Sequence, residues 1–314
     1  MIKNSRKTLP NLVGLVGSLG LTVAITFLGL MALTFFIGRV VPIDPVAAIV
    51  GAKAPKEVYD RVFHEMGMDK PVIAQFAEYL WRTLRGDLGT SFVTTRPVLT
   101  DIVAFFPATF ELATIGLVLG VITGVPAGVM SAYHHDTWVD HLIRVIGLIG
   151  YSVPIFWLAL VGLFVFYSKL DWVGGPGRLD IYYDGIVPPV TGLILVDSLL
   201  AGEQDVFWNA VGHITLPAIL LGYYSLAYIS RMTRSVMLEQ LSQEYVLTAR
   251  VKGASEFRVV ICHALRNAAI PLVTIVALSY GGLLEGSVLI ESVFSWPGIG
   301  NYIASSLFSA DMNA

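Results

Sequence analysis

The chain of 314 residues is poor in charge and has a single cysteine. Only 14% of its residues are Asp, Glu, Lys or Arg, against roughly 25% in soluble domains. The one cysteine, Cys262, excludes an intrachain disulfide. A formal net charge of −3 gives no reason to expect nucleic acid as a partner. With 55% hydrophobic residues and a mean hydropathy of +0.71, membrane spans are the first feature to test.

The sequence also lacks the motifs of several enzyme classes. It contains no G-x-x-x-x-G-K-[ST] and no Gly-Lys dipeptide, so the chain has no P-loop for ATP. Neither H-E-x-x-H nor G-x-S-x-G occurs. His134, His135 and His141 lie close together in the sequence, but an ordinary polar loop is a simpler interpretation than a metal site. We therefore expect no catalytic residue, no metal and no cofactor on this chain.

What the sequence does have is a set of long uncharged runs. Five of them contain no Asp, Glu, Lys or Arg: residues 8–38, 112–135, 145–168, 206–230 and 267–284. A helical span needs about 20 mostly apolar residues, and in lipid a helix satisfies its own backbone. The runs do not alternate in polarity as barrel strands do. The sequence thus predicts an all-α polytopic membrane protein with five spans.

The first run is interpreted as a retained helix. It is longer than the roughly 7–15 apolar residues of a signal peptide, and no small-x-small cleavage motif closes it. Basic residues precede it, which favours a cytoplasmic N-terminus. Alternation then places residues 40–105 and 169–205 outside and residues 132–144 and 231–266 inside. Residues 231–266 hold six Lys or Arg residues, as expected of a cytoplasmic segment.

The first external segment has a helical pattern of its own. Apolar residues at helical spacing predict two short amphipathic helices, broken near "GMDKP" at residues 67–71. They would lie on the membrane surface or over the mouth of the protein, although a solvated connector is the alternative. The C-terminal stretch after residue 290 holds Pro297, Gly298 and Gly300 and is too broken to span. Either five spans are complete, or the chain ends before a sixth.

Two carboxylates are candidates for a function inside the membrane. Glu111 lies at the start of the second span and Glu285 just past the fifth uncharged run. An intramembrane carboxylate suggests a functional site. The alternative is that both lie at the interface or bond to a neighbouring helix.

The most informative stretch is "EYVLTARVKGASEFRVVICHALRNAAIP", residues 244–271. Its first half favours a helix to Lys252, which Gly253 would stop or bend. Ala249 and Gly253 would share one helical face and allow close approach of another surface. Arg250 and Lys252 would meet acidic groups or lipid headgroups. A second helix is predicted from residue 256, so the stretch forms a helix–turn–helix that either docks a partner or only fixes topology.

This stretch resembles the coupling-loop motif of ABC importer permeases, E-A-A, three residues, Gly, nine residues, I-x-L-P. With Gly253 on the motif glycine, Ala249 and Leu265 match. Leu247, Thr248, His263 and Arg266 depart from the general motif. However, "TARVKGASEFRVVICHALRNAAIP" is similar to the form found in dipeptide, oligopeptide and nickel permeases. Further matches in order, including "VPIDPVAAIVG", "GDLGTSF" and "ESVFSWPGIG", extend the resemblance over nearly the whole chain.

The resemblance implies a type I ABC importer transmembrane-domain fold over residues 1–314. Its parts would be an N-terminal helix at 1–41, an external loop at 42–105, core spans at 106–291 with a coupling loop at 231–267, and an external segment at 292–314. Such permeases usually have six spans, which favours a sixth beyond the end of this chain. The implied function is import of peptides or a related small solute by alternating access. ATP and Mg would be bound by partner ATPases.

The implied partners are a second homologous permease, two ATP-binding cassette subunits, an external solute-binding protein and membrane lipid. The binding protein would dock on the external loops, including the Pro- and aromatic-rich residues 171–192; an inert connector is the alternative there. The ATPase would contact Glu244, Tyr245, Thr248, Ala249, Arg250, Lys252, Gly253, Ala254 and Ser255. A secondary transporter or channel without an ATPase explains the spans, but not the ordered motif matches.

Overall fold

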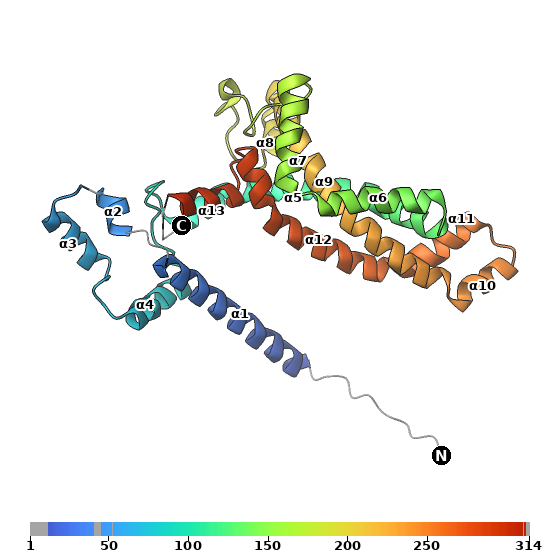
Figure 1. Ribbon diagram of the computed structural model, residues 1–314, viewed down its shortest axis with the longest axis horizontal. Coiled ribbons are helices and arrows are strands. Elements are labelled where there is room, and N and C mark those ends of the chain that lie inside the picture. Colours follow the sequence, from blue (N-terminus) through green and yellow to red (C-terminus); the bar gives the residue numbers. More distant parts are fainter. Residues whose placement is uncertain (1–11, 41–44, 52, 310, 312–314) are drawn as a thin grey trace, which may run out of the picture. The chain divides into compact units, whose positions relative to one another are not determined.

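The computed structural model describes residues 12–40, 45–51, 53–309 and 311, and every named element in these ranges is helical (Figure 1). The chain divides into two compact units. The first comprises Met1–Leu99 and Ser306–Ala314, and the second is Thr100–Ser305. The prediction of an all-α protein is confirmed for the described residues.

The first unit is built on α1 (Leu12–Val40), whose apolar side chains are exposed along most of its length. A helix that is apolar all round and uncovered suits lipid. After α2 (Pro45–Val50) come α3 (Lys56–Glu65) and α4 (Val72–Leu84). These two short helices confirm the predicted pair and its break, although their place on a membrane surface stays a prediction. The ring of Phe35 packs 5.3 Å from that of Phe76, which joins α1 to α4.

The second unit contains three long helices: α5 (Val98–Tyr133), α9 (Gln204–Leu241) and α12 (Arg266–Val293). Between α5 and α9 lie α6 (Trp138–Ser152), α7 (Ile155–Gly162), a π-helix (Leu163–Lys169), a 3-10 turn (Ile181–Tyr183) and α8 (Ile194–Ala201). Between α9 and α12 lie α10 (Glu244–Val251), α11 (Glu256–Arg258) and a second π-helix (Val259–Leu265). Helix α13 (Ile299–Phe308) follows α12.

Among the residues that the structure describes, four helices are long and apolar enough to span a membrane, and they cover four of the five predicted runs. The third predicted run, residues 145–168, is not one straight helix. Helices α6 and α7 meet there at a bend of 95°. The cause is Pro154, because the residue before a proline is driven out of the helical region, and Val153 is extended with ψ 128°. Five spans are reached only if this bent pair counts as one; a sixth stays a prediction.

A row of glycines brings α5 and α9 together. Gly116, Gly120, Gly124 and Gly128 recur every four residues, so they share one face of α5. A Cβ added at Gly120 would lie 2.5 Å from the Cβ of Ser225 on α9. Small residues at such a stripe let two backbones approach and pack in the membrane.

Two apolar clusters fill the second unit, one toward each end of α9. The first contains Leu112 on α5, Leu221 on α9 and the fully buried Trp296 after α12. The second contains Val129 on α5, Met237 on α9 and Ala264 in the π-helix before α12. Each end of the long helices is therefore stabilised by apolar packing. The two ends differ in how far the polar and apolar groups of their loops are buried.

Candidate coupling interface and buried polar anchors

The segment between α9 and α12 forms the predicted helix–turn–helix, at one end of the second unit (Figure 1). Gln243 is extended and occupies the N-cap position of α10, without a capping bond from its side chain. Val246 is fully buried and anchors α10 to the unit. The hydroxyl of Tyr245 donates to Oε1 of Gln240 over 2.9 Å, which ties α10 to the end of α9.

Gly253 lies outside α10, in the turn that ends it. Its φ of 82° is in the left-handed region, which glycine adopts without a steric penalty. Its amide donates to the carbonyl of Arg250 over 2.9 Å, and the amide of Ala254 donates to that of Ala249 over 3.1 Å. This pair of bonds is a Schellman motif. The prediction that Gly253 stops the helix is confirmed, whereas the prediction that it shares a helical face with Ala249 is wrong, because α10 ends at Val251.

The second half of the helix–turn–helix departs from the expected α-helix. After the three residues of α11 it is a π-helix, which continues into α12. The helical spacing of Phe257, Val260, Ile261 and Leu265 predicts one apolar stripe, but Val260 is buried whereas Phe257 is 76% exposed. One side of the stripe therefore packs inward, and Phe257 is left on the surface.

Three large apolar side chains are exposed on α10 and α11. Leu247 is 63% exposed, Val251 is 80% exposed, and Phe257 lies beyond the turn. Leu247 and Val251 are one helical turn apart and share a face of α10. We call these three residues the loop patch. The sequence analysis did not predict Leu247 or Val251 as docking residues. Two apolar residues four positions apart in a basic segment could have indicated them.

Polar groups surround the loop patch. The guanidinium of Arg250 bonds both carboxylate oxygens of Glu256 over 2.9 and 3.1 Å, across the turn at Gly253. Among the predicted coupling residues, six are exposed and three are partly buried. The exposed ones are Glu244, Thr248, Arg250, Lys252, Gly253 and Ser255, and the partly buried ones are Tyr245, Ala249 and Ala254. An apolar centre with a polar rim is the usual anatomy of a protein interface.

Of the two candidate carboxylates, Glu111 is a structural anchor. It is buried on α5 and pairs with Arg178, which lies 67 residues further along the chain. The amide of Leu195 donates to its other oxygen over 2.9 Å. Glu111 thus makes the bond to a neighbouring helix that the structural alternative predicts, through Leu195 on α8, while a role in translocation stays a prediction. Glu285 is exposed on α12 and makes no hydrogen bond or ion pair with the described part of the chain.

The segment 171–192 is folded rather than an open connector. Besides Glu111, Arg178 bonds the carbonyl of Gly192 over 3.1 Å, and its guanidinium lies 5.7 Å from the ring centre of Trp296. The buried Asp197 accepts bonds from the hydroxyl of Thr191 and from the amides of residues 190–192. Burial alone would raise the pKa of Asp197, but these bonds outweigh burial and hold the pKa below its usual range.

A further carboxylate, Glu291 on α12, escaped the sequence analysis. It is fully buried and accepts from the hydroxyls of Thr109 and Ser287 over 2.8 and 2.9 Å, and from the amide of Asn301 over 3.0 Å. A Cβ added at Gly298 would lie 2.5 Å from the hydroxyl oxygen of Thr109. The "PGIG" turn at residues 297–300 is thus closed on the carboxylate of Glu291.

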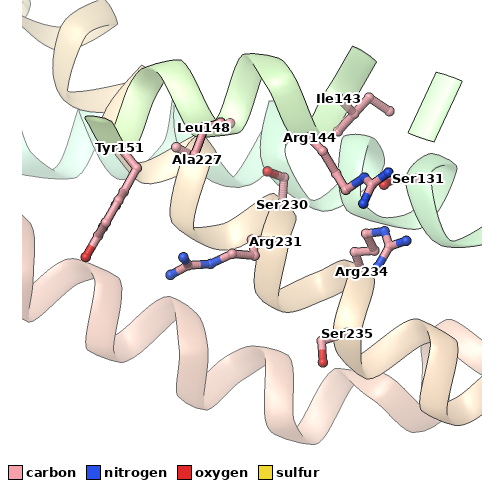
Figure 2. A pocket seen from close by; sticks show the side chains of 11 residues that line it. Ser131, Ile143, Arg144, Leu148, Tyr151, Ala227, Ser230, Arg231, Arg234 and Ser235 are labelled. Atoms are coloured by element: carbon pink, nitrogen blue, oxygen red, sulfur yellow. The ribbon is translucent and has the colours of Figure 1, made fainter. Parts of the chain in front are cut away.

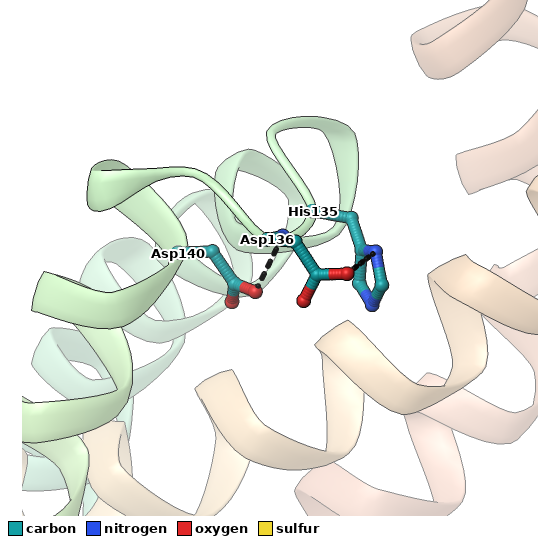
Figure 3. Close-up of side chains that lie close together, drawn as sticks. All are labelled: His135, Asp136 and Asp140. Atoms are coloured by element: carbon teal, nitrogen blue, oxygen red, sulfur yellow. Dashed lines mark hydrogen bonds and ion pairs between the residues drawn. The ribbon is translucent and has the colours of Figure 1, made fainter.

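The histidine-containing segment supports the polar-loop interpretation. One ligand atom each of His135, Asp136 and Asp140 lies within 4.8 Å of the others (Figure 3). However, the buried Asp140 is already occupied: Arg234 donates to its two oxygens over 2.7 Å each. It also accepts from Ser131 and from the amide of Asp136. A cation would have to displace this bidentate pair, so the residues present do not fit a metal site.

Comparison with known proteins supplies the family. Residues 124–314 match the model described as "Binding-protein-dependent transport system inner membrane component", and residues 15–113 match the N-terminal model of such membrane components. The chain is 43% identical to the "Di/tripeptide transport system permease protein DppB" of Pseudomonas aeruginosa, over 91% of this chain and 85% of that protein. It is 42% identical to the "Probable D,D-dipeptide transport system permease protein DdpB" of Escherichia coli, over 91% and 84%. With the "Dipeptide transport system permease protein DppB" of Escherichia coli it shares 40% identity, over 93% and 87%.

Proposed function

Because this chain belongs to the family of inner membrane components of binding-protein-dependent transport systems, we propose that it admits dipeptides or other short peptides through the cytoplasmic membrane. As a permease subunit of an ATP-driven importer it has no ATPase of its own, and ATP is hydrolysed on partner subunits. The proposal of a peptide substrate rests on relatives at 40–43% identity that are named for di- or tripeptide transport.

The feature that carries a coupling role is the loop patch. In this proposal an ATPase subunit covers Leu247, Val251 and Phe257 and contacts the predicted residues from Glu244 to Ser255. Burying three large apolar side chains would contribute about 1.5–3 kcal/mol each. The turn at Gly253 holds the two helical pieces at a fixed angle, so movement of the ATPase would pass to α9 and α12 as a rigid-body change.

The topology follows from the coupling role. If α10 faces the cytoplasm, the N-terminus is cytoplasmic and residues 42–105 and 171–192 are extracytoplasmic. The folded segment 171–192 presents Ile181, Tyr182 and Val190, each at least 73% exposed, to a solute-binding protein. A second homologous permease and a second ATPase complete the importer. Both units of the chain would serve this single transmembrane domain, and Glu285 keeps a candidate role in translocation because its carboxylate is exposed.

The coupling proposal is tested at Gly253 with two variants of the full chain in its native assembly. Gly253→Asn places a side chain that tolerates the left-handed region, whereas Gly253→Trp adds a large group at the same φ. No heavy atom lies within 4 Å of a Cβ built at Gly253, so inside the chain there is room for either. We expect Trp to abolish recovery of the ATPase subunits and peptide uptake, and Asn to retain most of both.

Two outcomes would contradict the proposal. ATPase recovery and uptake equal to those of the unaltered protein in Gly253→Trp would remove the docking role. Ion-driven uptake by the purified chain alone in proteoliposomes would show a secondary transporter instead. Competition of uptake by unlabelled dipeptides, compared with free amino acids, decides the substrate class separately.

A further inference from the structure

A cavity of about 290 Å³ lies between α6 and α9, next to the end of α5. Three arginines line it: Arg144 from α6, and Arg231 and Arg234 from α9. Figure 2 shows Arg144 and Arg234 directed toward one another from facing helices, with Arg231 and Tyr151 toward the other end. Neither the transport function nor the coupling loop accounts for this concentration of positive charge.

The cations of the cavity outnumber their counter-ions. The lining contains no carboxylate, and the acidic group that contacts it from outside is Asp140. Asp140 is engaged by Arg234 through two bonds of 2.7 Å and lies 3.6 Å from Arg144. Three guanidiniums against the carboxylates of Asp140 and of its neighbour Asp136, which lies within 4.8 Å of it, leave a formal charge of +1. A partly enclosed surplus of this kind favours an anion.

Arg231 is the arginine most available to a ligand. It makes no ion pair with the described part of the chain, and its guanidinium lies 5.2 Å from the ring centre of Tyr151. Stacking on an aromatic face orients the planar fork and leaves its N–H donors free to bind. The hydroxyl of Ser230 is a further donor in the lining. Guanidinium forks and hydroxyls together are the groups that bind phosphate oxygens.

The surroundings of the cavity are apolar. Ile143 and Leu148 line it, and along α6 the side chains of Leu142, Val145 and Ile149 are each about half exposed. The cavity thus combines a basic centre with an uncovered hydrocarbon surface beside it. A free inorganic anion uses only the first of these two features, whereas a phospholipid uses both.

We propose that this cavity binds the phosphate headgroup of an anionic membrane phospholipid, whose acyl chains lie along the exposed apolar residues of α6. Arg234 lies seven residues before the end of α9 at Leu241, or about 10 Å along the helical rise, so the site is near the coupling end of α9. In the proposed topology that is the cytoplasmic leaflet, where anionic lipids are drawn to basic pockets between helices. The inference goes beyond peptide transport and rests on the proposed function only for this topology.

The test is native mass spectrometry of the intact transporter in mild detergent, titrated with phosphatidylglycerol, with zwitterionic phosphatidylcholine and with inorganic phosphate. We expect a phosphatidylglycerol adduct that phosphatidylcholine does not reproduce. Arg144→Gln and Arg231→Gln should each weaken it about fivefold, and together about 25-fold. Arg231→Lys should retain most of the binding. Arg234 is left unchanged because it holds Asp140, and Arg266→Gln, an exposed arginine outside the cavity, is the matched control.

The outcomes are separable. Equal binding of the two lipids by the unaltered protein, or equal phosphatidylglycerol binding by the double variant, would overturn the proposal. Displacement of phosphatidylglycerol by millimolar inorganic phosphate would overturn the lipid assignment and indicate a soluble phosphate ligand. The lipid preference of the unaltered protein decides the matter even if the double variant does not fold.

Discussion

The two ends of α9 differ. At the closed end, residues 171–197 and 291–301, buried carboxylates are hydrogen-bonded within the chain. At the open end, around α10, large apolar side chains are exposed to solvent. Around residues 171–197 and 291–301, the carboxylates of Glu111, Asp197 and Glu291 are buried and bonded to loop amides or hydroxyls. Around α10 the corresponding groups are exposed, and Leu247 and Val251 face outward. The difference indicates that the buried charges of the first end are satisfied within this chain, whereas the apolar side chains of α10 are left available to a partner.

The largest effect is expected at the closed end, from Glu291→Ala. The change removes the acceptor of three donors, on Thr109, Ser287 and Asn301, and leaves a cavity in the core. Unfolding should be easier by about 4 kcal/mol. Thermal unfolding in detergent measures it, with Glu285→Ala on the same helix as the control. Melting temperatures that agree between Glu291→Ala and the unaltered protein would refute the anchoring role, and reduced uptake by a stable Glu285→Ala would support a role in translocation.

A somewhat smaller loss is expected when the other anchor is opened. Arg178→Met leaves the buried carboxylate of Glu111 without its cation, which should cost about 3 kcal/mol because a single buried charge is left unpaired. Replacing both members, as Glu111→Leu with Arg178→Met, should restore part of the stability. Hydrogen exchange of residues 171–192 reports the local opening. A double variant less stable than Arg178→Met would mean that the pair is not what holds this segment.

At the open end the same kind of substitution should act on assembly and not on folding. Val251→Asp introduces a charge at a side chain that is already 80% exposed, so the melting temperature of the permease should not change. Burial of that charge against an ATPase should weaken the complex by about 2 kcal/mol, or roughly 30-fold. Ile181→Asp, at a 93% exposed residue of the closed end, is the control. Equal recovery of ATPase subunits with all three proteins would show that the loop patch is not the contact.

The sequence predicted the features that depend on local chemistry. Uncharged runs marked the helices of the membrane core, and Gly253 marked the end of α10. Pro154 could also have indicated the bend, but the uncharged run around it was interpreted as one continuous span. Pairings between distant residues carried none: Arg178 follows Glu111 by 67 residues, and Thr109 precedes Glu291 by 182. Such partners are set by packing of the long helices, which no spacing rule reports.

The π-helix before α12 belongs to the same category. A period of 3.6 residues predicts one apolar face for Phe257, Val260, Ile261 and Leu265, but Phe257, which lies in α11 before the π-helix, is on the surface. The exposed half of that stripe became part of the loop patch. The helix–turn–helix was therefore placed correctly in the chain, while its most exposed apolar members were found only in the folded loop.

The smallest effect is expected for the ion pair that borders the loop patch. Arg250 and Glu256 are 40% and 45% exposed, so water and salt screen their attraction. Removing either should change the stability of the free permease by less than about 1 kcal/mol, and a double-mutant cycle in thermal unfolding measures their coupling. If Arg250→Ala lowers ATPase recovery more than Glu256→Ala does, Arg250 contacts the ATPase directly. If the two variants lower it equally, and the double variant no further, the pair acts by fixing the turn at Gly253. Either result therefore distinguishes a direct contact between Arg250 and the ATPase from an indirect role in which the ion pair stabilises the turn at Gly253.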